Sequence, residues 1–253
     1  MILTRPGNKR RIAEKIIPYF PYHTTFIDLF FGGGGLFFSK PRAKFNYCND
    51  IENDIFNLFQ VLKDKKDLLI KEIELMPIHQ TLFDYWKNNG EQNDIMKAVR
   101  FLFLSNFSYL GKQDTLHIKN ENPKQMILDK IQDTFKYIRD VYFLSCDFRE
   151  VLSKISWGSL DPSNVFIYAD PPYLNTCDKT YSYKWQTKDS EDLFEVLTKS
   201  GFKFALSEFD SSEILNLSDK YNLFVVNLGG RVNIKNKRNE ILITNYQNEQ
   251  TLF

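Results

Sequence analysis

Short runs of apolar residues alternate along the chain with longer segments whose apolar residues recur at helical spacing. The apolar runs predict seven strands, in the segments TTFID, KFNYC, VYFLS, NVFIY, FKFALSEF, YNLFVVNLGG and NEILITNY. Helical spacing at Ile55, Leu58, Phe59 and Leu62 predicts a helix from about Glu52. Further helices are predicted after the glycines of FGGGG, in SEDLFEVLTK, and in SSEILNLSDK behind a serine cap.

Strands that alternate with helices favour an α/β fold with a mainly parallel sheet covered on both faces. The last two strands are joined by the basic segment RVNIKNKR rather than by a helix. A connection without a helix allows the final strand to run antiparallel, which is common at the edge of such sheets.

The spacing of the strands also predicts an insertion. Three βαβ units would occupy about 90 residues, whereas the interval from Gly32 to Asp170 is ~140 residues. The surplus falls in a mostly helical, polar stretch. We therefore expect a catalytic domain formed by residues 1–63 and 141–253, and an inserted target-recognition subdomain formed by residues 64–140.

Composition limits the class of protein. A chain of 253 residues with 43% hydrophobic and 15% aromatic residues can bury a globular core, so it is not a disordered chain. Cys48, Cys146 and Cys177 are widely separated, which argues against a disulfide framework or a zinc site, and no metal ligands are expected. There is no apolar run for a signal peptide or a membrane span, so the expected compartment is the cytoplasm.

The formal net charge of +1 identifies no partner, but the basic residues are clustered near both ends of the chain. One cluster contains Arg5, Lys9, Arg10, Arg11 and Lys15, and the other contains Arg231, Lys235, Lys237 and Arg238. Two such clusters permit an anionic ligand such as nucleic acid. Two solvated loops would have the same composition.

Three predicted strand ends carry residues suited to an adenosine ligand. The glycines that begin at Gly32 let the backbone approach a ligand closely, and Asp50 ends the second strand, where an acid accepts hydrogen bonds from ribose hydroxyls. Asp147 and Phe148 could contact the adenine amino group and the base plane. No phosphate-binding lysine follows the glycines, which favours S-adenosylmethionine over a nucleotide. A tight turn and a capping acid remain the structural alternative.

The segment NVFIYADPPY ends an apolar strand on Asp170, Pro171, Pro172 and Tyr173. The exocyclic amine of a nucleobase is a poor nucleophile because its lone pair is delocalised into the ring. The Asp170 carboxylate and the Pro171 carbonyl can accept hydrogen bonds from the two N–H groups of this amine and draw the nitrogen towards tetrahedral geometry. Tyr173 can stack on the base. Such a pocket requires a single-stranded or flipped base. A rigid strand-to-loop turn is the alternative.

Taken in order, these segments resemble the motifs of the Dam-type (alpha-group) adenine-specific DNA methyltransferases, over residues 1–60 and 141–253. RPGNKRRI is similar to the family's opening motif, with Lys9 at the methionine end of the cofactor and Arg5 at the usual tryptophan position. FIDLFFGGGGLFF, CNDIENDIF, SCDF and DPPY resemble its glycine, ribose, adenine and catalytic motifs. KFALSEF and KRNEILITNY resemble two later motifs.

This resemblance implies a Rossmann-like S-adenosylmethionine-dependent methyltransferase with a mixed, seven-stranded sheet. The implied cofactor residues are Arg5, Lys9, Asp28, Phe30, Gly32, Gly34, Asp50, Asp147, Phe148 and Asp170. The implied catalytic residues are Asp170, Pro171, Pro172 and Tyr173. Methylation of the N-6 amino group of adenine in double-stranded DNA is the implied reaction. The opening aspartate of the tetrapeptide favours adenine over cytosine or RNA targets.

Methylation of RNA or of a cytosine amino group remains an alternative, as does a non-catalytic DNA-binding relative. The enzyme would act as a monomer or a weak dimer, either beside a restriction endonuclease or as an orphan methylase. The expected DNA contacts are Lys112, Lys119, Lys124, Arg231, Lys235, Lys237 and Arg238. Asn106, Phe107 and Tyr109 are expected in the core rather than as wedges between bases, because apolar residues flank them.

Overall fold

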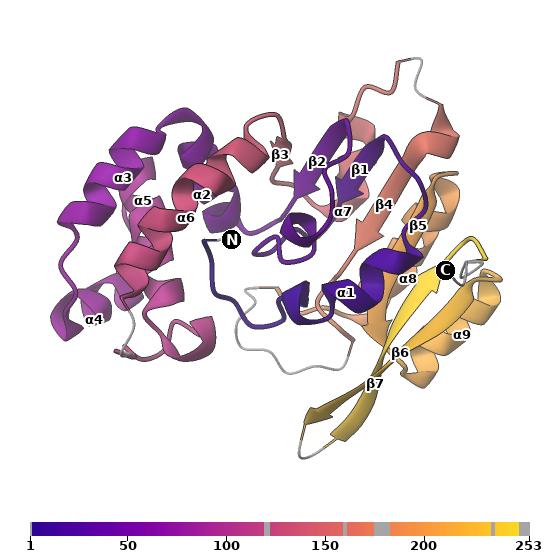
Figure 1. The fold of residues 1–253 in the computed structure, drawn as a ribbon. Helices are drawn as coiled ribbons and strands as arrows, with labels where there is room; N and C mark the ends of the chain where they lie inside the picture. The colour runs from indigo at the N-terminus through magenta and orange to yellow at the C-terminus, as the bar shows by residue number, and fades with distance from the viewer. Residues whose placement is uncertain (1, 119–121, 159–160, 175–182, 234–235, 248–253) are drawn as a thin grey trace.

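A seven-stranded mixed sheet forms the centre of the computed structural model, which describes residues 2–118, 122–158, 161–174, 183–233 and 236–247 (Figure 1). The strands are β1 (Thr25–Asp28), β2 (Phe45–Asn49), β3 (Tyr142–Leu144), β4 (Val165–Ala169), β5 (Lys203–Phe209), β6 (Phe224–Asn233) and β7 (Asn236–Thr244). They lie in the order β3-β2-β1-β4-β5-β7-β6. β1 to β5 pair in parallel and β7 is antiparallel to both neighbours, which confirms the expected antiparallel final strand.

Successive residues of the central strands supply two different cores, because side chains in a strand alternate between the faces of the sheet. Phe26 and Phe166 belong to one buried cluster, and Ile27 and Ile167 belong to the other. All four side chains are fully buried. Near-continuous apolar strands such as VFIYA are therefore explained by a sheet that is covered on both sides.

Helices cover both faces of the sheet (Figure 1). Side chains of α7 (Phe148–Val151), α8 (Thr187–Lys199) and α9 (Ser212–Lys220) complete the cluster of Ile27 and Ile167. The cluster of Phe26 and Phe166 receives α1 (Ala13–Ile16), α2 (Asn53–Asp64), α3 (Lys66–Leu75), α4 (Gln80–Asn88), α5 (Asp94–Asn106) and α6 (Pro123–Ile138). Ser211 caps α9 by accepting from the Ile214 amide, as its sequence predicts. Within the described residues, none of the helices is long and apolar enough for a membrane span.

The four helices α3 to α6 occupy most of residues 64–140 and lie to one side of the sheet (Figure 1). Their buried side chains join the same cluster as those of α2, so this segment shares its core with the sheet. Phe59 of α2, for example, stacks on Phe143 of β3 with ring centroids 5.3 Å apart. The assignment of residues 64–140 to target recognition stays a prediction.

Two local expectations from the sequence are wrong. The glycines are followed by a 3-10 turn, Phe37–Ser39, rather than by an α-helix. Lys40 precedes Pro41 and is extended, because a residue before proline disfavours the helical region, and this leaves no room for an α-helix. The basic segment RVNIKNKR is also not a separate loop, because β6 continues to Asn233 and β7 begins at Asn236.

The order of the strands places a crevice between β1 and β4. The chain passes from β1 to β2 and β3 on one side, and then returns to β4 on the other side of β1. In open α/β sheets, ligands bind outside the carboxyl ends of the strands at such a switch point. Asp28 ends β1 at this edge and Asp170 directly follows β4.

Candidate active site

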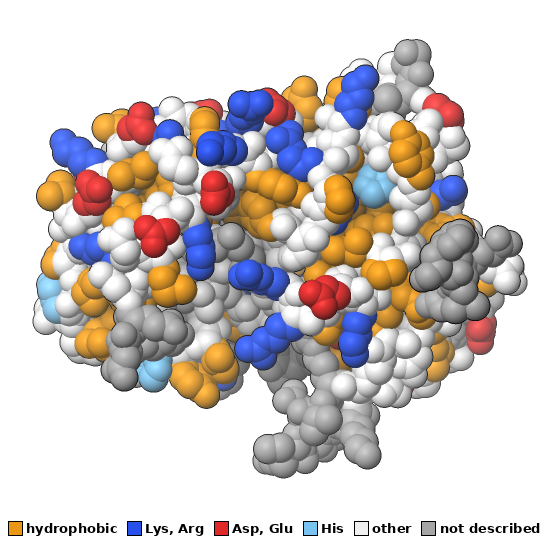
Figure 2. Space-filling model, in the orientation of Figure 1, with side chains coloured by type: hydrophobic (Ala, Val, Ile, Leu, Met, Phe, Trp, Pro, Cys, Tyr) orange, Lys and Arg blue, Asp and Glu red, His pale blue; other side chains and the backbone are white. Residues whose placement is uncertain are grey.

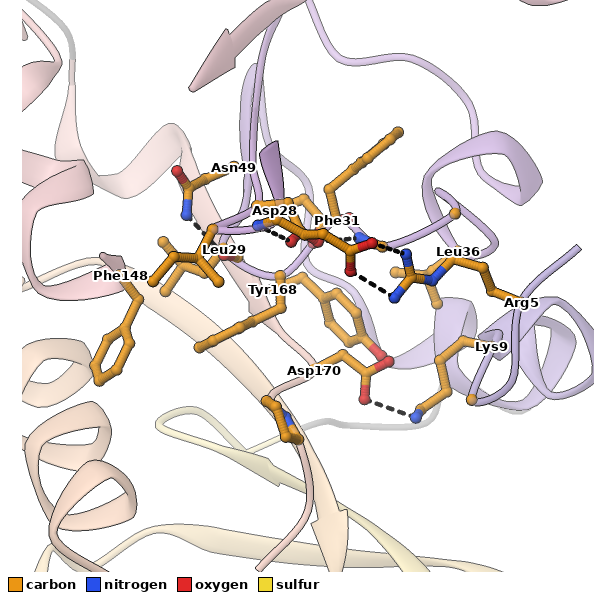
Figure 3. Close-up of a pocket in the computed structure, with 18 of the residues that line it drawn as sticks. Arg5, Lys9, Asp28, Leu29, Phe31, Leu36, Asn49, Phe148, Tyr168 and Asp170 are labelled. Carbon is orange, nitrogen blue, oxygen red and sulfur yellow. Dashed lines mark hydrogen bonds and ion pairs between the residues drawn. The ribbon is translucent and has the colours of Figure 1, made fainter. Parts of the chain in front are cut away.

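A cavity of about 1080 Å³, its open mouth included, lies at the carboxyl ends of β1 to β4 (Figure 3). Its walls come from these strand ends and from the N-terminal segment Arg5–Lys9. The sequence-predicted residues on its wall are Arg5, Lys9, Asp28, Phe30, Gly32, Asp50, Asp147, Phe148, Asp170 and Pro172. Gly34, Pro171 and Tyr173 do not line it. The cavity therefore brings together most of the predicted cofactor residues and the start of the catalytic tetrapeptide.

The glycine turn shapes the floor of the cavity and holds Asp50. Gly32 has φ +54° and its amide donates to Asp50 Oδ2 at 2.7 Å. Gly34 has φ +72°, and a Cβ atom there would lie 2.6 Å from Phe31 and Phe38, so Gly34 permits packing rather than ligand contact. Asp50 Oδ1 accepts from the Glu52 amide at 2.9 Å. Burial raises the pKa of Asp50 to about 6, and these two backbone donors oppose the shift.

Arg5 forms the next part of the wall through an ion pair that the sequence did not reveal. Its guanidinium donates to both carboxylate oxygens of Glu52, at 2.8 and 2.7 Å, and its side chain is 7% exposed. The same guanidinium lies 5.9 Å from the ring centroid of Phe101 in α5. Arg5 therefore joins the N-terminal segment to α2 and α5 beside the cavity.

An aromatic triangle closes the opposite end. The rings of Phe30, Phe148 and Trp185 lie 5.6 Å apart, centroid to centroid, in all three pairs. Trp185 was not predicted, because it precedes α8 in a segment without a motif, and its indole donates to Ser190. Aromatic walls of this kind suit the plane of an adenine ring.

Asp147 lies at the same end of the cavity and is fixed by an arginine. Arg149 donates to Asp147 at 2.9 Å, to Asp189 at 2.6 Å and to Asp192 at 2.9 Å. These bonds tie α7 to α8. A carboxylate oxygen accepts more than one hydrogen bond, so the pair with Arg149 leaves Asp147 able to accept from a ligand.

Asp28 is a buried acid at the centre of the cavity wall. It is 2% exposed, and its Oδ1 atom has no hydrogen-bond partner among the described residues. Burial and the neighbouring Asp170 carboxylate raise the pKa of Asp28 well above its ordinary value. A buried acceptor without a partner costs free energy, which a cationic or hydrogen-bond-donating ligand in the cavity would recover.

Asp170 lies in a polar cluster that reaches from β4 to the N-terminus (Figure 3). Lys9 is 5% exposed, and its Nζ atom lies 2.6 Å from Asp170 Oδ1 and 3.4 Å from Glu240 Oε1. The same ammonium lies 4.5 Å from the ring centroid of Tyr173. The Tyr173 hydroxyl donates to Glu240 Oε1. Glu240 was not predicted as a site residue, although the closing motif KRNEILITNY contains it.

A second buried acid holds the chain just after the tetrapeptide. Glu208 of β5 is 2% exposed, and its two oxygens accept from the amides of Leu174, at 2.9 Å, and Phe209, at 2.7 Å. Burial raises the pKa of Glu208 to about 8. This contact fixes the backbone that follows Tyr173, so Glu208 supports the loop rather than the cavity.

Three of the predicted DNA contacts, Lys112, Lys124 and Arg238, have side chains among the described residues. Lys112 is exposed, whereas Lys124 donates to the Glu74 carbonyl at 2.9 Å and Arg238 lies over the Phe209 ring. Lys119 and the side chains of Arg231, Lys235 and Lys237 lie outside the described residues.

The expectation of a core position is confirmed for Phe107, which is 2% exposed. Asn106 is half-buried and donates to the carbonyls of Ile2 and Leu102. The same expectation is wrong for Tyr109, which is 56% exposed. α5 ends at Asn106, and the turn through Leu110, with φ +54°, directs Tyr109 into solvent.

Comparisons with known proteins point to one family. The family described as D12 class N6 adenine-specific DNA methyltransferase matches residues 6–237. The chain is 24% identical to the type II methyltransferase M1.LlaDCHI of Lactococcus lactis, over 96% of this chain and 94% of the relative. It is 25% identical to the type II methyltransferase M.MjaIII of Methanocaldococcus jannaschii, over 95% and 96%. It is 26% identical to a DNA adenine methylase of Haemophilus influenzae, over 66% and 61%.

The family match spans both predicted parts of the catalytic domain and the helical segment between them. It confirms the resemblance that the motifs carry, and the mixed seven-stranded sheet agrees with the fold expected from it. The chain therefore belongs to the D12 class N6 adenine-specific DNA methyltransferase family.

Proposed function

We propose that the chain transfers the methyl group of S-adenosylmethionine to the N-6 amino group of an adenine flipped out of double-stranded DNA. The observation that carries this proposal is one continuous cavity with an aromatic and acidic end at Phe148 and Asp147, and Asp170 at the other. A base drawn from a duplex could approach Asp170 through the open mouth.

The residues present fit the cofactor. Bound S-adenosylmethionine would supply an electrophilic methyl group on a sulfonium. The Oδ1 atom of Asp28, which has no hydrogen-bond partner among the described residues, offers an acceptor for a positively charged hydrogen-bond donor of the cofactor. Asp50 offers an acceptor for the ribose hydroxyls, and the aromatic triangle offers ring faces for adenine.

The target amine would be oriented by acceptors on the tetrapeptide. Asp170 is 18% exposed and lies on the cavity wall, so its carboxylate can accept one amine hydrogen and stabilise positive charge on the nitrogen. The Pro171 carbonyl would accept the second hydrogen. Tyr173 does not line the cavity and its ring contacts Lys9 and Phe209, so stacking on the base would require the ring to turn towards the cavity.

Nucleoside analysis of treated DNA tests this function. Duplex DNA incubated with the protein and methyl-labelled donor should yield labelled N6-methyl-2′-deoxyadenosine, and single-stranded RNA should yield no labelled nucleoside. Labelled methylcytosine or labelled RNA would support the rival enzymes. Donor binding without turnover on genomic DNA would support a non-catalytic relative. Sequencing methylated adenines in expressing cells would give the recognition sequence.

We expect the affinity for S-adenosylmethionine to fall as the pH drops below about 6. Asp50 has a raised pKa of about 6, so its carboxylate is increasingly protonated below that value and accepts less well from ribose. Linkage limits the loss to about tenfold per pH unit for one proton. Calorimetric titrations between pH 5 and pH 7.5 measure it. Asp50→Asn should bind weakly and lose this component, and an unchanged pH profile in that variant would contradict the assignment.

Basic side chains beside the cavity mouth offer a path for the DNA backbone. Residues 5–9 line the cavity, and the next two residues, Arg10 and Arg11, are exposed. The loop of Lys112 packs on the same segment, since a Cβ atom on Gly111 would lie 2.2 Å from the Thr4 carbonyl. Lys and Arg side chains gather across the middle of this face (Figure 2). We propose that Arg10, Arg11 and Lys112 contact DNA phosphates.

The double variant Arg10→Gln/Arg11→Gln should weaken DNA binding and reduce its salt dependence. The slope of log K against log salt is negative, and the loss of two phosphate contacts should reduce its magnitude by about 1.8. Fluorescence anisotropy with a duplex at several salt concentrations measures the slope, and donor affinity should not change. Lys203→Gln/Lys220→Gln removes the same charge from exposed positions at the start of β5 and the end of α9, and serves as the control. Equal slopes in the two double variants would refute the path.

A further inference from the structure

Glu240 is a buried acid that reaches the catalytic cluster from a distant strand. It lies on β7, two strands from β4 in the sheet, and is 2% exposed. Its register partners are Phe209 on β5 and Gly229 on β6, and the β6–β7 pairing is irregular between Asn227 and Gly229. Bulges of this kind re-aim side chains and are common beside active sites.

Glu240 contacts Lys9 and Tyr173, which belong to the polar cluster around Asp170. Its Oε1 atom lies 3.4 Å from Lys9 Nζ and accepts the hydrogen bond of the Tyr173 hydroxyl. Lys9 in turn lies 2.6 Å from Asp170. Glu240 does not line the cavity, so it contacts neither a cofactor nor a base there. Glu240 can therefore affect catalysis through its contacts with Lys9 and Tyr173.

The charge of Glu240 affects how strongly Asp170 can accept a hydrogen bond. The Lys9 ammonium is shared between two carboxylates in a buried region, where charge interactions are strong. Without the negative charge of Glu240, Asp170 alone would balance the charge of the Lys9 ammonium, and the electrostatic potential at Asp170 would be more positive. Asp170 would then be a weaker acceptor for an amine hydrogen and would offset less of the positive charge that develops on the nitrogen.

Glu208 provides an internal comparison. It lies on the adjacent strand β5 and is buried to the same extent, 2% exposed. Its two oxygens accept backbone amides, and the Glu208 hydrogen bonds do not involve Lys9 or Tyr173. The hydrogen bonds of Glu208 are thus with the backbone, whereas the Glu240 carboxylate contacts side chains of the catalytic cluster.

We infer that Glu240 is a positioning residue for methyl transfer, which holds the Lys9 ammonium and the Tyr173 hydroxyl so that Asp170 keeps its accepting strength towards the target amine. The inference rests on the proposed function. It concerns the negative charge of Glu240 and not only its shape, and this distinction can be measured with two substitutions.

Glu240→Gln keeps the shape without the charge, and Glu240→Asp keeps the charge with a shorter side chain. In single-turnover methylation of duplex DNA we expect the rate at saturation to fall roughly 10- to 100-fold in Glu240→Gln, with the KM values for donor and DNA within about twofold of wild type. Glu240→Asp should be faster than Glu240→Gln. Glu195→Gln, an exposed acid on α8 paired with Lys199, should match wild type.

The measured rates distinguish failure of the inference about Glu240 from failure of the proposed function. A Glu240→Gln rate equal to wild type, or a Glu240→Gln rate above that of Glu240→Asp, would overturn the inference and leave the proposed function intact. A fall in Glu240→Gln that appears only in KM would also overturn it, because the residue would then act in binding. Absence of turnover by the wild-type protein on any duplex would overturn the proposed function and this inference with it.

Discussion

Asp170→Ala should abolish methyl transfer while donor and DNA binding persist. The substitution removes the carboxylate on the cavity wall that would accept an amine hydrogen, and it removes the negative charge nearest to the developing cation. Loss of a preorganised electrostatic partner costs about 10²–10³ in rate, and the lost alignment of the amine adds to this, so we expect a fall of at least about 10³-fold.

Three measurements separate the causes. Turnover with labelled donor gives the rate, calorimetry gives donor affinity, and anisotropy gives duplex affinity. Asp170→Asn keeps an accepting oxygen without the charge, so its rate should lie between those of wild type and Asp170→Ala. Turnover of Asp170→Ala within tenfold of wild type would remove Asp170 from the mechanism, whatever the affinities are.

Local patterns in the sequence were sufficient to predict the strands of the sheet and the residues at their carboxyl ends. The apolar runs predicted all seven strands, and the carboxyl ends of parallel strands necessarily meet at one edge, which is why Asp28, Asp50 and Asp170 line the same cavity. The predictions succeeded where the residue and its neighbours along the chain determine the position.

The missed residues reach the site through tertiary packing. Glu52 lines the cavity beside Arg5, with which it pairs, and Trp185 lines it where it packs on Phe30 and Phe148. Glu240 lies behind the cavity wall and reaches Lys9 because β7 inserts between β5 and β6. None of these relations has a fixed spacing in sequence. Tyr109 was placed wrongly because apolar neighbours suggest burial, whereas a left-handed turn at Leu110 decided its direction.

Lys9→Met should destabilise the fold and reveal how far one ammonium supports the cluster. Methionine matches the length of the lysine stem, so packing changes little, but the ammonium between Asp170 and Glu240 is lost. Breaking a buried ion pair by removing one partner costs about 3–5 kcal/mol, because the remaining charge is left in a poorly solvated position. We expect urea unfolding at pH 8 to report a loss of about 3 kcal/mol or more.

Arg10→Met changes an exposed cation in the same 3-10 turn, Lys9–Arg11, and should cost no more than about 0.5 kcal/mol. A Lys9→Met deficit that matches this control would mean that the ammonium does not hold the two acids together.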